Sequence, residues 1–96
     1  MARSICKLEG MYFEWSSVVD APVTSGMTLD EFKKYYRDEY GRHGFEGLAK
    51  RLEKVELEST TDPFCTIEEL IQTNRCGPRG GAVSRETIIK RLKSKS

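Results

Sequence analysis

Two short segments with alternating apolar side chains flank the pair Glu9-Gly10 near the start of the chain. The segments span residues 5–8 and 11–15, and Gly10 supplies the positive φ that a two-residue hairpin turn requires. Such a turn fixes which residues of the two strands face each other, so this pattern constrains the fold more than any other in the sequence. It predicts an antiparallel β-hairpin.

The predicted register gives the hairpin one apolar face. With a two-residue turn, Leu8 lies opposite Met11, and Cys6 lies opposite Phe13. Trp15 shares the face of Met11 and Phe13, because alternate residues of a strand point the same way. A tryptophan at this position is either a core residue or a platform for base stacking, and we favour the core.

Capping signals predict three helices after the hairpin. Thr28 and Glu31 fit a capping box, so a helix should begin after Thr28, and Gly41 should end it. Its apolar stripe consists of Leu29, Phe32, Tyr36 and Tyr40. A second capping box at Thr66 predicts a short helix that closes near Gly77, and Ser84 is a good N-cap for a last helix over about residues 85–93.

The segments between these signals are less regular. Apolar residues at helical spacing predict a helix over about residues 45–53. Residues 54–60 alternate in polarity, which favours a strand there. Val18-Val19 fits a short extended segment within the connection 16–27. Together these elements predict an α+β fold, in which a small antiparallel sheet starting with the N-terminal hairpin packs against three to four short helices.

The size of the chain limits it to one domain. Its 96 residues, 38% of them hydrophobic, form a single domain over residues 1–96 with a modest core. Cys6, Cys65 and Cys76 are an odd number without paired spacing, which predicts neither a disulfide framework nor a zinc site. No apolar run is long enough for a signal peptide or a membrane span. We therefore expect a soluble protein of the cytoplasm.

Charge is distributed unevenly along the chain. Residues 75–96 hold seven of the sixteen Lys and Arg but one of the fifteen Asp and Glu, a net charge of +6. The net charge of the whole chain is +1, so residues 1–74 carry −5. The basic segment 75–96 suits a small phosphorylated ligand, a short contact with nucleic acid, or an acidic surface, including that of a second copy.

The loop before the last helix has the composition of an anion-binding site. It contains Gly77, Gly80 and Gly81, which let backbone N–H groups approach a ligand, and it precedes a helix N-terminus. Basic side chains suited to phosphate are Arg75, Arg79, Arg85 and Arg91. The alternative is a solvated basic tail after a flexible turn, and the sequence alone leaves both open.

The sequence offers little for catalysis. His43 is the only histidine and has no Cys or carboxylate at metal-ligand spacing, and the phosphate-binding motif of nucleotide hydrolases is missing. We therefore expect a binding protein without catalytic residues, cofactor or metal. Phe64 could stack on a purine or be a core ring after a proline turn, and Asn74 could bond a base or ribose edge or cap its helix.

Phe64, Asn74 and Arg91 follow one another at intervals of ten and seventeen residues. In this spacing the chain resembles the phage-encoded sponges that counter bacterial Thoeris defence by sequestering cyclic ADP-ribose signals. The resemblance implies an α+β homo-oligomer with ligand pockets between protomers, which captures its ligand without cleavage in the host cytoplasm. It also implies that a cyclic oligonucleotide could bind at a separate site. The predicted ligand-binding residues are Phe64, Asn74, Arg75, Arg79 and Arg91.

Two other functions compete with this prediction. The first is a small nucleic-acid-binding or protein-binding module that uses the basic segment 75–96, for which charge is the only argument. The second, which we favour least, is a nucleotide-processing enzyme that uses Glu68, Glu69 or His43.

Overall fold

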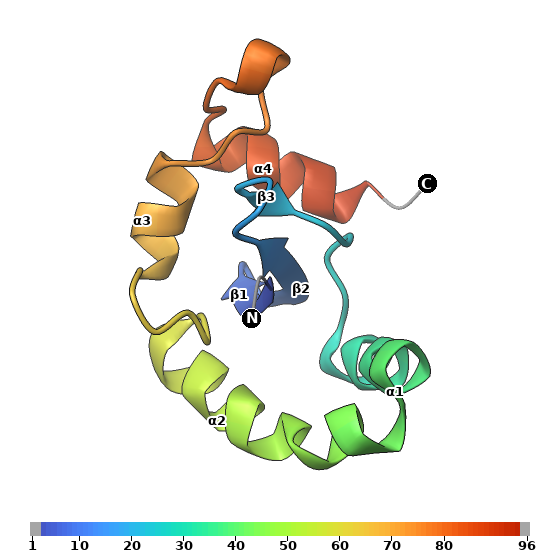
Figure 1. Cartoon of the computed structure of the whole chain (residues 1–96). Helices are drawn as coiled ribbons and strands as arrows, with labels where there is room; N and C mark the ends of the chain where they lie inside the picture. The colour runs from blue at the N-terminus through green and yellow to red at the C-terminus, as the bar shows by residue number, and fades with distance from the viewer. Residues whose placement is uncertain (1–2, 95–96) are drawn as a thin grey trace.

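The computed structural model, which describes residues 3–94, has a small antiparallel sheet between two pairs of helices (Figure 1). The helices follow one another around the sheet as an open ring, which confirms the predicted α+β architecture. The strands are β1 (Arg3–Leu8), β2 (Met11–Ser16) and β3 (Ala21–Pro22), in the spatial order β1-β2-β3. The helices are α1 (Leu29–Glu46), α2 (Leu48–Glu58), α3 (Ile67–Gln72) and α4 (Arg85–Lys93), and a 3₁₀ turn, η1, spans Pro78–Gly80. Across residues 3–94, no helix has both the length and the apolar character that a membrane crossing needs.

The hairpin forms with the predicted register. Leu8 pairs with Met11, and Cys6 pairs with Phe13. Glu9 has φ 51° and Gly10 has φ 76°, so both turn residues adopt the left-handed conformation of a type I′ turn. This turn matches the twist of the strands, which explains why two residues are enough to connect them.

Both faces of the hairpin are buried. One face packs on α3 and α4, and Trp15 lies in this cluster with 1% exposure, as a core residue rather than a stacking platform. The other face packs on α1 and α2. The first cluster contains Cys6, Leu8, Phe13, Trp15, Ile67, Leu70, Ile71, Ile88 and Leu92. The second contains Ile5, Tyr12, Phe32, Tyr36, Leu48, Leu52 and Val55.

The prediction of a strand over residues 54–60 is wrong. α2 continues to Glu58, because Leu48, Leu52 and Val55 are all buried at helical spacing and outweigh the local alternation. Ser59 ends the helix in the left-handed conformation, with φ 66°. Only residues 59–61 then pair with the free edge of β1, through a bridge between Cys6 and Thr60 and flanking backbone bonds.

Three further boundaries differ from expectation. α3 ends at Gln72, before its predicted end near Gly77. Val18 and Val19 form no strand: they lie exposed in the turn before β3, where Pro22 pairs with Trp15. At Gly41 (φ 72°, ψ −168°) the helix is interrupted as predicted, but a further helical turn follows and ends at Glu46. The predicted capping residues Thr28, Thr66 and Ser84 all accept a bond from the third amide of their helices.

The Gly10→Ala variant tests the hairpin turn. A Cβ at Gly10 meets no atom within 4 Å, so the cost is backbone strain alone. We expect the free energy of unfolding, measured in denaturant, to fall by about 1 kcal/mol. Gly47→Ala is the matched control, because Gly47 has φ −85° and a Cβ there finds ordinary contact at 3.9 Å. An equal loss in both variants would contradict this explanation.

Candidate functional site

α2 carries basic and acidic side chains on different flanks. Lys50, Arg51 and Lys54 line one hollow of the surface, whereas Glu53 and Glu56 line another. Between the two flanks, the apolar face of α2 is buried against the sheet. The helix therefore separates a basic hollow from an acidic-rimmed one.

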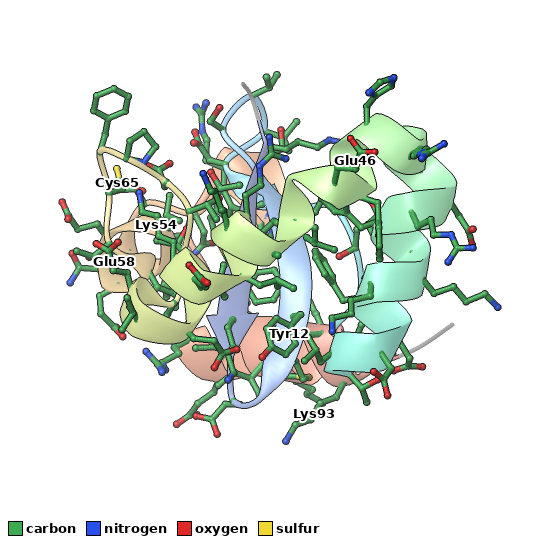
Figure 2. All side chains as sticks on the ribbon, turned by 90° about the horizontal axis from the view of Figure 1, so that it is seen from below. Tyr12, Glu46, Lys54, Glu58, Cys65 and Lys93 are labelled. Carbon is green, nitrogen blue, oxygen red and sulfur yellow. The ribbon has the colours of Figure 1, made fainter. Side chains whose placement is uncertain are left out.

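The basic hollow is the larger, with a volume of about 830 Å³, and we call it the basic pocket. It lies between the start of β1, α1, α2 and the loop 61–64. Figure 2 labels Lys54 and Cys65 on this side, where the chain after α2 passes back along the helix. The lining residues are Arg3, Ser4, Ile5, Glu14, Ser17, Tyr36, Tyr40, Lys50, Arg51, Lys54, Thr61, Asp62, Pro63 and Phe64.

Glu14 supplies a buried carboxylate to the wall of the basic pocket. Its side chain is 3% exposed and accepts hydrogen bonds from the hydroxyls of Tyr35 and Tyr40. The Arg3 guanidinium lies 3.8 Å from the same carboxylate and also donates to Tyr40. Burial raises the pKa of Tyr35 and of Tyr40, and the bonds to Glu14 raise them further. Both hydroxyls therefore remain donors at neutral pH.

Aromatic rings and cations both line the pocket. The rings of Tyr36 and Tyr40 lie 4.5 Å apart, and Arg51 donates a hydrogen bond to the Tyr36 hydroxyl. Lys54 reaches the Thr61 carbonyl at 3.5 Å, a long bond. Lys50 makes no ion pair within residues 3–94. The pocket thus has two guanidinium groups oriented by tyrosine hydroxyls, Arg3 and Arg51, and two ammonium groups that a ligand can recruit.

Phe64 stands at the mouth of the basic pocket. The Asp62 carboxylate accepts the backbone N–H groups of Phe64 and Cys65, both at 2.8 Å, and so fixes the turn. The Phe64 ring is 90% exposed, so it is not a core ring. Stacking on a purine remains a prediction for this residue.

Asn74 has a different role from the predicted ligand contact. It is 2% exposed, and its Oδ1 accepts from the N–H groups of Cys76 and Val83 at 3.2 and 2.9 Å. Its Nδ2 donates to the carbonyls of Ile71 and Val83. Both donors and both acceptor positions of the amide are occupied, so we assign Asn74 to holding the loop rather than to binding a ligand.

The glycine-rich loop is closed on itself. The N–H groups of Gly77, Gly80 and Gly81 all donate to carbonyls within the loop, which leaves these glycine amides unavailable to an anion. Arg91 donates to the Cys76 carbonyl at 2.8 Å and so ties the loop to α4. Arg79 is exposed in the 3₁₀ turn, with φ 59°.

The residues predicted to bind a ligand therefore lie in different parts of the structure and do not line one pocket. Phe64 lines the basic pocket, whereas Arg91 lines a smaller hollow of about 290 Å³ beside Cys76. Arg75 and Arg79 are exposed on the glycine-rich loop, and Arg85 pairs with Glu68 at 2.6 Å.

The sequence prediction missed the cations of the basic pocket: Arg3, Lys50, Arg51 and Lys54. The helical spacing of Lys50, Arg51 and Lys54 could have placed these three cations on one flank of a helix. The predicted helix ended at residue 53, however, and so excluded Lys54.

The three cysteines have thiols with raised pKa values. Burial raises the pKa of the Cys6 thiol to about 12, which keeps it protonated. Burial also raises the pKa of Cys65 and Cys76, and all three cysteines are free. Within residues 3–94 no three His, Cys, Asp or Glu side chains gather as metal ligands would.

Replacing Asn74 tests its role in the loop. Asn74→Ala leaves buried N–H and carbonyl groups of the loop without partners, so we expect the free energy of unfolding to fall by about 2 kcal/mol. Chemical denaturation measures this, with Gln72→Ala at an exposed position as the control. A loss no greater than that of the control would contradict the assignment.

The tyrosines around Glu14 give a test by titration. Their raised pKa values mean that they stabilise the fold below about pH 10, and that this stability is lost as pH rises through the folded-state values. Glu14→Gln removes the carboxylate that favours the neutral phenols. We expect the phenolate absorbance of this variant to rise at lower pH, whereas Glu9→Gln leaves the titration unchanged. An unaltered curve for Glu14→Gln would refute the coupling.

Comparison with known proteins identifies no relative: no protein-family model, no curated protein and no solved structure matches the chain significantly.

Proposed function

We propose that this protein binds and retains a small phosphorylated nucleotide of the cyclic ADP-ribose class in the basic pocket, without cleaving it. The observation that carries the proposal is the convergence of four basic side chains with three aromatic rings on one hollow. The cations are Arg3, Lys50, Arg51 and Lys54, and the rings are those of Tyr36, Tyr40 and Phe64.

The chemistry of the pocket suits each part of such a ligand. Lys50 and Lys54 can pair with a pyrophosphate, and Arg51 is held in place by Tyr36. The exposed ring of Phe64 offers a face to a purine. A volume of about 830 Å³ lies within the range of pockets that enclose small ligands.

Retention without turnover would act by mass action. A protein that binds a signalling nucleotide tightly lowers its free concentration below the dissociation constant of the effector, which then stays unoccupied. The resemblance to the Thoeris anti-defence sponges motivates this role in a bacterial host, and of the three residues that carry it, Phe64 is the one that lines the basic pocket.

The double variant Lys50→Ala/Lys54→Ala tests the pocket. We expect its affinity for cyclic ADP-ribose isomers, measured by calorimetry, to fall by at least about tenfold, because two charged phosphate contacts are lost. The control is Arg75→Ala/Arg79→Ala, which removes two cations from the glycine-rich loop and should leave affinity unchanged. If only Arg75→Ala/Arg79→Ala lowered the affinity, the ligand would bind at the glycine-rich loop instead.

The proposed absence of turnover needs a separate measurement. The protein is incubated with the isomers, freed of unbound material and heat-denatured, and the released ligand is analysed by chromatography. An intact isomer is the expected result, whereas a cleaved product would indicate an enzyme. If oligonucleotides are retained instead, with steep salt dependence that Arg75→Ala/Arg79→Ala reduces, a nucleic-acid-binding role of the basic segment 75–96 would replace the proposal.

A further inference from the structure

A second hollow lies on the acidic flank of α2, between this helix and α1, and we call it the apolar groove. Its volume is about 580 Å³. Tyr12 lies at its base and is visible between the two helices in Figure 2. Two of its apolar side chains remain partly open to solvent, Leu29 with 37% and Phe45 with 38% exposure. The lining residues are Tyr12, Leu29, Lys33, Phe45, Leu48, Ala49, Leu52, Glu53 and Glu56.

The two rims of the apolar groove carry opposite charges. Lys33 lies on the α1 rim, and Glu53 and Glu56 lie on the α2 rim. Glu56 already accepts hydrogen bonds from Tyr12 and Lys7. Lys33 and Glu53 make no ion pair within the described part of the chain, residues 3–94. The groove thus carries one positive and one negative side chain, on different helices, that make no ion pair in this part of the chain.

Further cations extend the basic rim along α1. Lys33, Lys34 and Arg37 border a shallow hollow that also touches Phe45. The Arg37 guanidinium lies 5.9 Å from the centre of the Phe45 ring, which orients that ring at the border of the groove. Asp30 and Asp38 line the same hollow, so three cations and two carboxylates give this part of α1 a net charge of +1.

We propose that the apolar groove is the contact surface between two copies of this chain related by a two-fold axis. A two-fold rotation about an axis parallel to the groove exchanges its rims, so the α1 rim of each copy faces the α2 rim of the other. Lys33 of one copy then lies against Glu53 of its partner, and the same pair forms a second time. Leu29 and Phe45 of each copy cover the groove of the other.

Self-complementarity is the reason to favour a second copy over another protein. A groove with one basic and one acidic rim matches itself under a two-fold rotation without any change of charge, and the contact buries apolar side chains that water otherwise covers. The interface lies on the flank of α2 opposite the basic pocket, so the pocket of each copy stays open. The inference is thus independent of the ligand proposed above.

Charge reversal at the two rims tests the contact. Sedimentation of the full chain over a concentration series should show a monomer–dimer equilibrium. Lys33→Glu places two acidic pairs in the dimer and Glu53→Lys places two basic pairs, so each should weaken association by at least about tenfold. An equimolar mixture of the two variants should dimerise again, because both pairs of the mixed dimer have opposite charges. The double variant Lys33→Glu/Glu53→Lys should also dimerise.

The controls separate this inference from misfolding and from ligand binding. Circular dichroism checks that each variant is folded, and Lys34→Glu, on the same helix but outside the groove lining, should reduce association less than Lys33→Glu. A wild-type chain that stays monomeric at all concentrations would overturn the inference. Impaired single variants that do not recover on mixing would also overturn it, since Lys33 and Glu53 would then not be partners. Neither result changes the expected effect of Lys50→Ala/Lys54→Ala on nucleotide affinity.

Discussion

Burial of β2 on both faces is the constraint on which the rest of the structure depends. Tyr12, Phe13, Glu14 and Trp15 are consecutive residues, and each is at most 5% exposed. Alternate side chains of a strand point to opposite faces, so a helix pair on one side alone could not cover them. α1 and α2 cover one face, and α3 and α4 cover the other. The small sheet is stable because the whole remaining chain is wrapped around it.

The charged member of that strand shapes the basic pocket. A buried carboxylate needs hydrogen-bond donors, and Glu14 receives them from α1 through Tyr35 and Tyr40, with Arg3 of β1 nearby. Arg3 and Tyr40 also line the basic pocket, whereas Tyr35 does not. The hydrogen bonds that a buried carboxylate requires have therefore brought polar groups to a concave surface.

Local signals in the sequence predicted much of the fold and little of the site. The Glu9-Gly10 turn and the caps at Thr28, Thr66 and Ser84 act within a few residues, and all are found where expected. The end of α2 was missed because the burial of Val55 depends on tertiary packing rather than on local alternation. The basic pocket escaped prediction for a similar reason: Arg3, Lys50 and Phe64 belong to segments that only the folded chain brings together. The hydrogen-bonding capacity of Asn74 was predicted to contact a ligand, but its amide bonds the backbone of Cys76 and Val83.

The pairing of β1 with residues 59–61 bears on how the chain reaches this structure. The hairpin needs only neighbouring residues and can form early, whereas Cys6 meets Thr60 across 54 residues of sequence. Until α1 and α2 have folded and Ser59 has turned the chain, that edge of β1 has unpaired backbone groups. During synthesis on the ribosome, this edge of β1 therefore stays unpaired until residues 59–61 have been made and positioned, and an unpaired strand edge favours aggregation.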